Sequence, residues 1–319
     1  LEPEEITLFE QNEFSLYSLA MELEEQFPDV QFRRLLGDVC DPEAVQFVFS
    51  QYRPQVVFHA AAYKHVPMLQ AQLRETIRNN TVGTMVTARA AVECGVQKFI
   101  LISTDKAVNP TSMMGVSKRL AEMVAQLNNA KSPTAFITVR FGNVLGSAGS
   151  VVPLFERQIR AGGPVTVTDP MMTRYFMTIS EACQLILQAC AIGRGGEIFV
   201  LNMGEPVKID YLARQMIRLS GKLPEEEIEI RYTGLRPGEK LTEELFHPDE
   251  DLAPTSYDKI LLAQSRSFDE IHLESELETL RRSVEVYDHE QARHIAIGLV
   301  PEYREVQESS TPESPDQAA

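Results

Sequence analysis

The first 205 residues of the chain alternate between two patterns of hydrophobic and polar positions. Short apolar runs bounded by Gly, Pro or Asn, such as 98–102, are too short to form helices and are typical of buried strands. The longer segments between them, such as 14–27, carry apolar residues three and four positions apart, which is the spacing of a helix that buries one face. The chain is therefore predicted to alternate strands with helices.

The predicted elements follow one another in an order that defines a fold class. Strands alternating with helices of this length imply right-handed crossovers and a parallel sheet. We therefore predict an α/β protein with a Rossmann-type doubly wound parallel sheet and a smaller α/β lobe. The predicted strands are 6–9, 30–36, 55–59, 98–102, 136–140, 165–168 and 197–202, and the predicted helices are 14–27, 42–52, 84–94, 112–129, 152–160 and 180–191.

Polar side chains follow the strand 98–102 directly. Thr104, Asp105 and Lys106 supply a hydroxyl, a carboxylate and an amine at its carboxyl end, which is the edge where open α/β sheets bind ligands. A helix beginning near Ser112 would place Met114 and Lys118 on one face, a single turn apart. This stretch is the predicted centre of the chemistry.

Composition and charge narrow the classes of partner. Of the 319 residues, 44% are hydrophobic, which suits a globular protein with a sizeable core. The net charge of −16 argues against binding to nucleic acid or to an anionic membrane surface. Four dispersed cysteines without His at ligand spacing predict neither a metal site nor a disulfide framework. No run of ~18 apolar residues is present, so we expect a soluble, cytoplasmic chain.

One expected feature is absent at the front of the sequence. A dinucleotide-binding unit opens with a strand, a Gly-x-Gly-x-x-Gly turn and a helix, because the pyrophosphate needs close backbone approach. No such turn occurs upstream of Glu10. We therefore expect that the first strand and glycine-rich loop are missing, and that this strand belongs between those at 6–9 and 55–59.

Five longer motifs resemble a known family. They are 59–67 (HAAAYKHVP), 103–110 (STDKAVNP), 140–146 (RFGNVLG), 172–175 (MTRY) and 235–240 (LRPGEK). Over roughly residues 1–302 the chain resembles the UDP-N-acetylglucosamine 4,6-dehydratases of polysaccharide and glycan biosynthesis, within the extended short-chain dehydrogenase/reductase superfamily. Met114 stands where the superfamily carries Tyr, as in a branch whose longer members have an N-terminal membrane region.

The resemblance implies an activity and roles for the central residues. It implies a lyase that uses NAD to convert UDP-N-acetylglucosamine to the 4-keto-6-deoxy sugar nucleotide, for capsule, O-antigen or another glycan. Thr104 would hold the 4-oxygen, Asp105 would protonate the departing 6-hydroxyl, and Lys106 would take the carbon-5 proton. Burial is expected to lower the pKa of Lys106 and so fit it for the role of base.

Candidate cofactor residues lie at several predicted strand ends. Glu10 occupies the place of the acidic residue that binds the adenosine ribose, which favours NAD and leaves NADP open. Asp38 and Val39 resemble a pair that reads the adenine edge, although Asp38 could instead cap the helix after Pro42. By resemblance Lys118 points at the nicotinamide ribose and Asn80 supports the active-site strand. The remaining candidates are Ala60 and Ala61, which either allow close backbone approach or simply pack tightly, and Lys64, Ser103 and Val144.

Candidate substrate residues lie after the last strand of the predicted sheet and in the smaller lobe. Arg236 has bidentate geometry for a diphosphate and Glu239 suits a ribose diol, although the two could form only a surface ion pair. The full predicted set is Asn143, Ser150, Val151, Thr168, Arg174, Arg236 and Glu239.

The predicted organisation leaves rival functions open. Residues 1–146, with 175–205, would form the NAD(P)-binding domain, residues 147–174 and 206–302 the substrate lobe, and residues 303–319 a disordered tail. A UDP-sugar epimerase and a non-catalytic NAD-binding regulator are the rivals, the second supported only by Met114. We expect a homo-oligomer, and contact with the inner membrane only through a missing N-terminal region, with the catalytic domain facing the cytosol.

Overall fold

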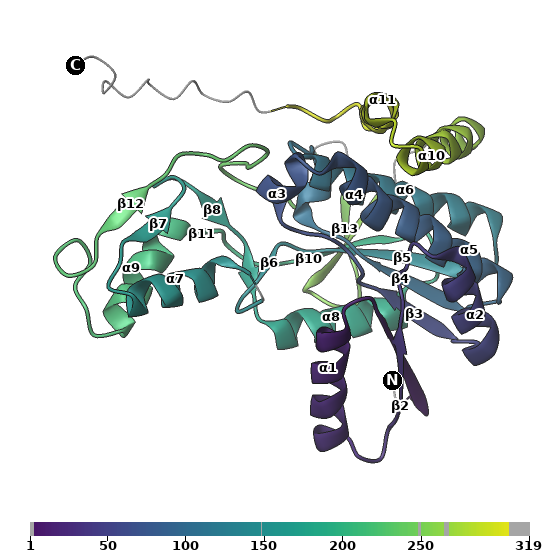
Figure 1. Ribbon diagram of the computed structural model, residues 1–319, viewed down its shortest axis with the longest axis horizontal. Coiled ribbons are helices and arrows are strands. Elements are labelled where there is room, and N and C mark those ends of the chain that lie inside the picture. The colour runs from purple at the N-terminus through teal and green to yellow at the C-terminus, as the bar shows by residue number, and fades with distance from the viewer. Residues whose placement is uncertain (1–2, 148, 248–249, 265–267, 306–319) are drawn as a thin grey trace.

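The centre of the protein is a six-stranded sheet with the order β13-β14-β10-β5-β4-β3 (Figure 1). A computed structural model describes residues 3–147, 149–247, 250–264 and 268–305. Neighbouring strands from β3 to β10 run parallel, whereas β14 is antiparallel to both β10 and β13. This confirms the predicted α/β class with a mostly parallel sheet. The strands are β3 (Val56–His59), β4 (Lys98–Ile102), β5 (Ala135–Arg140), β10 (Ile198–Leu201), β13 (Leu252–Pro254) and β14 (Ile260–Ala263).

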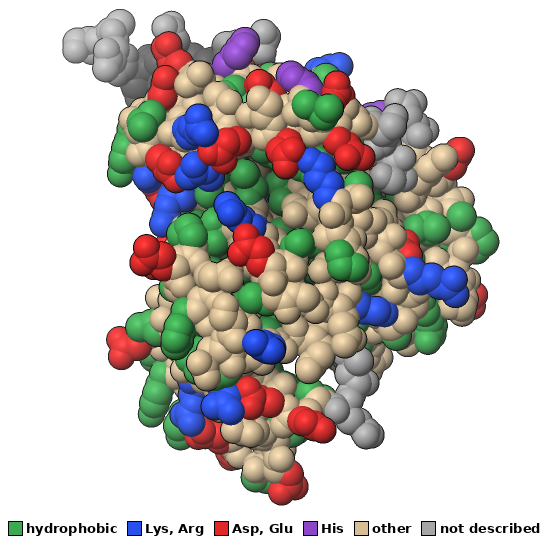
Figure 2. Space-filling view, turned by 90° about the vertical axis from the view of Figure 1, so that its right-hand side faces the viewer, with side chains coloured by type: hydrophobic (Ala, Val, Ile, Leu, Met, Phe, Trp, Pro, Cys, Tyr) green, Lys and Arg blue, Asp and Glu red, His purple; other side chains and the backbone are tan. Residues whose placement is uncertain are grey.

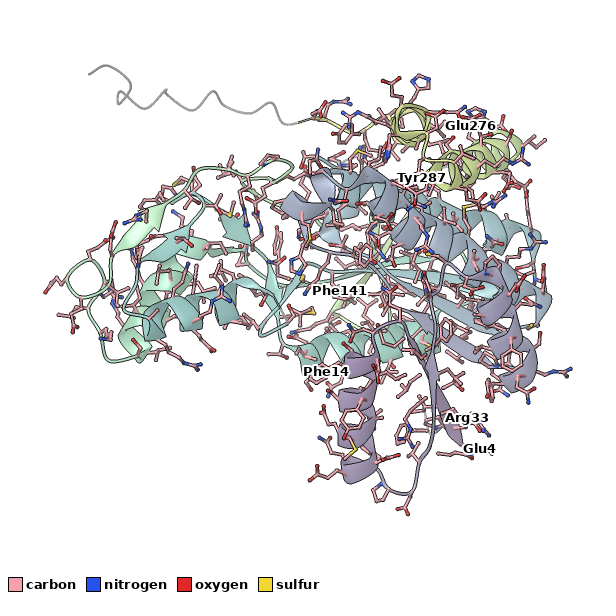
Figure 3. All side chains as sticks on the ribbon, in the orientation of Figure 1. Glu4, Phe14, Arg33, Phe141, Glu276 and Tyr287 are labelled. Atoms are coloured by element: carbon pink, nitrogen blue, oxygen red, sulfur yellow. The ribbon has the colours of Figure 1, made fainter. Side chains whose placement is uncertain are left out.

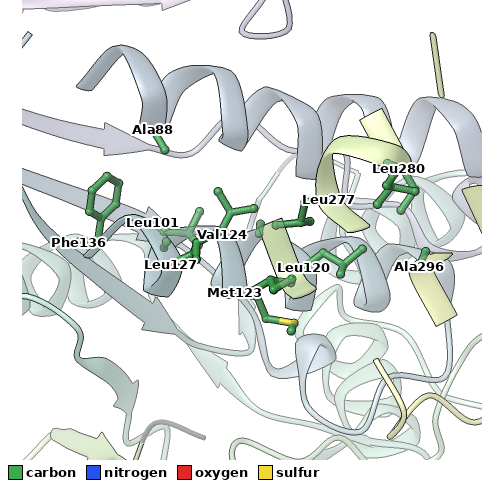
Figure 4. Packing of buried hydrophobic residues seen from close by; sticks show 14 of the residues in the cluster. Ala88, Leu101, Leu120, Met123, Val124, Leu127, Phe136, Leu277, Leu280 and Ala296 are labelled. Carbon is green, nitrogen blue, oxygen red and sulfur yellow. The ribbon is translucent and has the colours of Figure 1, made fainter. Parts of the chain in front are cut away.

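Helices cover both faces of this sheet because its strands are apolar on both sides. In β4, Phe99 and Leu101 point into the larger hydrophobic cluster, whereas Ile100 between them points into a second one. The larger cluster, shown in Figure 4, contains α2 (Pro42–Tyr52), α5 (Gly83–Glu93) and α6 (Met113–Lys131). The second cluster contains α8 (Ile179–Ile192). Between β3 and α5 lie α3 (Val66–Gln70), α4 (Leu73–Ile77) and the π-helix Arg78–Val82.

The first three elements form a small unit of their own, which lies below the main sheet in Figure 1. β1 (Glu5–Glu10) pairs in parallel with β2 (Gln31–Leu36), and α1 (Glu13–Gln26) connects them. α1 begins at Asn12, whose side chain accepts a hydrogen bond from the Ser15 N–H at 2.8 Å. Among the described residues, no strand lies between β1 and β3, where the strand order predicts one.

A second lobe is built around its own hydrophobic cluster. α7 (Val151–Arg160) and α9 (Ile209–Leu219) pack against β7 (Val165–Val167) and β12 (Ile230–Tyr232), which pair in parallel. β8 (Thr173–Arg174) and β11 (Val207–Lys208) pair beside them. Figure 3 labels Phe141 where the main sheet meets this lobe, just before β6 (Asn143–Val144), which pairs with β9 (Phe176–Met177).

Part of the predicted domain division is wrong. Residues 206–302 were assigned to the substrate lobe, but β13 and β14 extend the main sheet beside β10. The physical reason is that 260–263 (ILLA) is an uninterrupted apolar run, which suits a strand covered on both faces. The other predicted boundaries, at 146, 174 and 206, stay predictions.

The C-terminal helices also belong with the main sheet. α10 (Glu270–Glu285) and α11 (His289–Leu299) form a hairpin whose apolar side packs on α6. Tyr303, placed in the predicted disordered tail, is buried in the same cluster, and the Arg304 N–H donates to the Pro110 carbonyl at 3.0 Å. The rest of that tail, 306–319, lies outside the described residues.

Three further features concern the surface, the helices and metal binding. On the face shown in Figure 2, Lys and Arg side chains are interspersed with Asp and Glu. Within the described parts of the chain, no helix is long and apolar enough to cross a membrane. The described residues also contain no group of His, Cys, Asp and Glu side chains arranged to hold a metal ion.

Candidate active site

A cleft of about 640 Å³ lies between the carboxyl edge of the main sheet and the second lobe. Its walls carry Lys64 and Lys106 from the main-sheet side and the 233–240 segment from the second lobe. All seven residues predicted to bind substrate line this cleft: Asn143, Ser150, Val151, Thr168, Arg174, Arg236 and Glu239. Segments separated by about a hundred residues of chain therefore meet at one cavity.

The residues after β4 form a compact hydrogen-bonded group. Thr104 caps a short 3-10 turn, and its hydroxyl donates to Asp105 Oδ1 at 2.8 Å. Lys106 Nζ donates to the same oxygen at 2.9 Å and to Asn143 Oδ1 at 3.3 Å. Asp105 is fully buried, and no described residue bonds its other oxygen, Oδ2. A buried carboxylate oxygen without a partner is unusual and suits a group that must bond a ligand.

The charge state of Lys106 differs from the expectation. Burial by itself would lower the pKa of this amine, but the carboxylates of Asp105 and Glu243 outweigh burial and raise the pKa above its ordinary value. Glu243 Oε1 lies 3.6 Å from Lys106 Nζ. The prediction of a lowered pKa was therefore wrong, because it considered burial without the second carboxylate.

α6 places Met114 and Lys118 as predicted, on the side facing the strand ends. Ser112 caps the helix by accepting from the Gly115 N–H at 3.1 Å. Met114 is buried against Val66 and Leu69, so its apolar side chain closes the wall behind the cleft. Lys118 Nζ donates to the Ile102 carbonyl at 2.7 Å, and burial lowers the pKa of this lysine to about 8.

We expect the change Lys118→Met to stabilise the fold at neutral pH. The folded-state pKa, about 8, lies below the ordinary 10.5, so the unfolded chain binds the proton more tightly and stability rises with pH between these values. Removing the buried ammonium should add about 2 kcal/mol at pH 7, after the lost hydrogen bond is subtracted. Urea unfolding at pH 7 and pH 10 measures this.

The same measurements contain their own control. The gain from Lys118→Met should shrink at pH 10, where both states of the wild type are losing the proton. Lys131→Met, at the half-exposed end of the same helix, should change stability little at either pH. A gain that stays equal at both pH values would contradict the assignment.

Two predicted cofactor residues, Glu10 and Asp38, lie at the ends of β1 and β2, and one alternative for Asp38 is corrected. Glu10 ends β1, and its carboxylate accepts from the Asn12 N–H at 2.9 Å. The carboxylate of Asp38 accepts from Arg78 at 2.8 Å and from the Cys40 N–H at 2.8 Å, and these bonds outweigh burial and lower its pKa. The alternative that Asp38 caps the next helix is wrong, since Asp41 caps α2.

After β3 the backbone is open. Ala60 is exposed and Ala61 and Ala62 are half-buried, and the choice between close cofactor approach and tight packing stays a prediction. Lys64 lines the cleft, and partial burial lowers its pKa. Val39 lies against Gly83, where a side chain would approach it to 2.9 Å. Small, accessible residues at a strand end are what close approach by a cofactor requires.

The side chains of three predicted cofactor residues bond or pack against other parts of the protein. Asn80 is buried, and its amide bonds both backbone groups of Tyr63 and the Ser117 hydroxyl. It therefore braces the 60–65 loop against α6, and its predicted place in the cofactor site stays a prediction. The buried Ser103 hydroxyl donates to Glu122 at 2.7 Å, and Val144 packs in the apolar cluster under α8.

The substrate side shows the alternative arrangement of Arg236 and Glu239. Their side chains pair with each other at 2.6 Å, with Arg236 still 58% exposed. Arg174 is buried, and its guanidinium donates to the carbonyls of Thr173, Lys240 and Leu241. Arg174 thus fixes the 240–243 segment, whereas Arg236 could exchange its present partner for a ligand at the cleft wall.

Sequence reasoning missed several buried groups around the site. Glu243 contacts Lys106, and its only signal was a position three residues after the LRPGEK motif. His59 bonds the Thr84 hydroxyl at 3.0 Å, and burial lowers its pKa to about 3, so it is neutral. Behind Ser103 lies a buried ionic network of Arg119, Glu122, Arg140 and Glu250.

Comparisons with known proteins agree on one family. A family model described as "Polysaccharide biosynthesis protein" matches residues 1–265. The chain is 52% identical over 261 residues to the capsular polysaccharide biosynthesis protein CapD of Staphylococcus aureus, covering 81% of this chain and 43% of CapD. The chain therefore spans less than half the length of that relative.

Two further comparisons concern named enzymes. The chain is 35% identical over 252 residues to the UDP-glucose 4-epimerase of Rickettsia canadensis, covering 78% of this chain and 70% of that protein. The dTDP-glucose 4,6-dehydratase DesIV of Streptomyces venezuelae, solved as a double mutant with NAD bound, has a similar structure, with a TM-score of 0.67. This match is 20% identical in sequence and covers 77% of this chain and 80% of DesIV, so it supports the fold alone. The family match over most of the chain, together with the motifs around the cleft, shows that the chain belongs to the polysaccharide biosynthesis protein family.

Proposed function

We propose that the protein is an NAD-dependent 4,6-dehydratase acting on a UDP-N-acetylhexosamine, with UDP-N-acetylglucosamine as the substrate. The observation that carries this proposal is the Thr104-Asp105-Lys106 group, in which Asp105 is fully buried and Lys106 reaches the cleft. Dehydration needs both an acid and a base beside the sugar, and this group supplies a carboxylate and an amine 2.9 Å apart.

The residues at the strand ends fit a dinucleotide. The backbone at Ala60 and Ala61 is accessible, Glu10 offers a carboxylate at the end of β1, and Lys118 holds a buried amine beside the end of β4. Bound NAD would accept a hydride from carbon 4 of the sugar and return it to carbon 6. A carboxylate at Glu10 would repel a 2'-phosphate, which favours NAD over NADP.

The chain's own residues would carry the proton steps. A proton passing from Lys106 Nζ to Asp105 Oδ1 would convert the ion pair into a neutral amine and a carboxylic acid. Lys106 could then take the proton from carbon 5, while Asp105 protonates the 6-hydroxyl as it leaves as water. Thr104, whose hydroxyl donates to Asp105 Oδ1 and accepts from the Lys106 N–H, would hold the 4-oxygen while the 4-hydroxyl proton passes to solvent. In the last step Lys106 would return the proton to carbon 5, and Asp105 would regain its own from solvent. Because the pKa of Lys106 is raised, its amine must first give its proton to Asp105 before it can act as a base.

The far wall of the cleft supports the nucleotide assignment. Arg236 offers two parallel N–H donors for a diphosphate, and Glu239 would then be free to accept from a ribose diol. Ser150 adds a buried hydroxyl oxygen that no described residue bonds, at the start of α7. These groups lie on the second-lobe side, away from the acid and base, as a long substrate requires.

An epimerase is the second candidate, because the UDP-glucose 4-epimerase relative matches 70% of its own length. Epimerisation needs the hydride steps but no acid–base pair for elimination. The Asp105-Lys106 pair therefore favours dehydration.

Product analysis tests the proposal. The chain completed with the expected upstream strand and glycine-rich loop, and supplied with NAD and UDP-N-acetylglucosamine, should form a 4-keto-6-deoxy sugar nucleotide, detected by its alkaline chromophore and by mass spectrometry as loss of one water. UDP-glucose and dTDP-glucose, run in parallel, should be poorer substrates. An unchanged mass with an inverted 4-hydroxyl by NMR would establish an epimerase instead, and cofactor binding without turnover would favour a regulatory protein.

A further inference from the structure

Glu243 is a buried carboxylate at the cleft for which the proposed mechanism has no role. It is 4% exposed, and its Oε1 lies 3.6 Å from Lys106 Nζ and 3.8 Å from Arg174 Nε. Its other oxygen, Oε2, is bonded by none of the described residues. A buried charge without full hydrogen bonding is destabilising, so its presence at the cleft needs a functional reason.

The backbone that carries Glu243 is held from both sides of the cleft. Arg174 donates to the carbonyls of Lys240 and Leu241 at 2.8 and 3.2 Å, and the Thr173 N–H donates to Leu241 at 3.0 Å. On the main-sheet side, Lys240 Nζ donates to the Val108 carbonyl at 2.9 Å. The position of the carboxylate is therefore set by the structure and does not depend on one flexible side chain.

Lys106 lies between two carboxylates from different parts of the molecule. Asp105 precedes it on the main-sheet side, and Glu243 approaches from the second-lobe side. Arg174 is the cation that faces Glu243, and Asn143 contributes a neutral oxygen. The other titratable groups that line this cleft are Lys64, His65, Glu239 and Lys240. Without Glu243, two cations would face a single carboxylate, which would favour the neutral amine at Lys106.

We propose that Glu243 is a positioning residue that holds the Lys106 ammonium in the cleft and sets how readily Lys106 gives up its proton. This inference rests on the proposed role of Lys106 as the base. Glu243 acts through Lys106, keeping its amine directed between the acid at Asp105 and the substrate. Because Arg174 and the Val108 carbonyl hold the segment that carries Glu243 from opposite sides, the base is completed only when both sides of the cleft are in place.

The change Glu243→Gln tests this, since it removes the charge and keeps the shape. The pH at which the catalytic rate rises should move down by about 1–3 units, because a carboxylate within 4 Å of the amine is lost. KM should change little. Glu244→Gln is the matched control, because the adjacent Glu244 bonds Lys240 and Asn109 instead of Lys106. Its profile should match the wild type, and Glu243→Asp, which keeps the charge, should keep most of the wild-type profile.

A second measurement does not depend on turnover. The rate at which an amine-reactive reagent labels Lys106, followed by mass spectrometry across pH, reports the fraction of neutral amine directly. In Glu243→Gln this labelling should begin at lower pH than in the wild type and in Glu244→Gln. Coincident labelling curves for all three proteins would overturn the inference. A shifted curve in a protein that forms no dehydrated product would uphold it and refute the proposed function instead.

Discussion

Replacing Lys106 by Met should reduce dehydration by about 10²–10⁴-fold, the usual contribution of a positioned acid–base group. Met fills a similar volume but cannot take a proton, so the carbon-5 proton would remain in place. Oxidation at carbon 4 comes before the carbon-5 proton is removed, so it does not require a base at carbon 5. Reduced nicotinamide should therefore accumulate, measured by its absorbance, while no 4-keto-6-deoxy product forms.

Isotope exchange decides whether Lys106 is that base. The wild type should exchange the carbon-5 proton with deuterated water, and Lys106→Met should not. Lys208→Met, which changes an exposed lysine of the second lobe, should leave turnover and exchange at wild-type levels. Exchange at the wild-type rate in Lys106→Met would remove Lys106 from the role of base, whatever the overall activity.

Replacing Glu122 by Ala should lower the free energy of unfolding by about 3–5 kcal/mol, the range for breaking a buried ion pair. Arg140 forms a bidentate pair with Glu122, with both bonds at 2.7 Å, and Arg119 bonds the same carboxylate at 3.1 Å. All three side chains are buried. The change would leave two buried guanidinium groups short of a carboxylate, and urea unfolding measures the loss.

The effect should depend on pH in a defined direction. Although burial opposes ionisation, Arg140 and Arg119 lower the pKa of Glu122 to about 2, below its ordinary 4.5. The unfolded chain therefore binds more protons between these values, and the stability that Glu122 provides is lost as pH falls from about 4.5 to about 2. The difference in the free energy of unfolding between the wild type and Glu122→Ala should decrease as the pH falls across that range.

An exposed carboxylate provides the control for Glu122. Glu278 on α10 has a similarly lowered pKa, caused first by its hydrogen bond to Arg281, but it is exposed to solvent. Glu278→Ala should cost no more than about 1 kcal/mol, because surface ion pairs are worth little. Equal losses for both variants would show that the network behind Ser103 behaves like a surface pair.

The sequence predicted the elements whose signal is local. Apolar runs located the strands of the main sheet, and residues at their carboxyl ends converged on one edge because parallel strands share that edge. Four of the seven substrate candidates lie in the quoted motifs, and all seven meet at one cleft. These predictions needed no knowledge of which distant residues touch.

The features that were missed depend on such distant contacts. The raised pKa of Lys106 comes from Asp105 and, in addition, from Glu243, which lies 137 positions further along the chain, and no spacing rule connects Glu243 with Lys106. The Ser103 hydroxyl donates to Glu122 on α6, and Arg140 on β5 holds that carboxylate in place. The packing of β14 and of the C-terminal hairpin on the main sheet was also missed. An apolar run or helix face indicates burial but not which element it packs against.

The burial of α6 has a consequence for how substrate enters. Every residue from Met113 to Leu127 is buried, because the sheet lies on one side of the helix and the C-terminal hairpin on the other. Amide hydrogens in that helix can exchange with solvent only when the whole core opens. Residues 233–237 are exposed and should exchange by local opening at far lower free energy. Local opening of the segment after β12 would then control access to the cleft, while the helix that carries Lys118 keeps its position.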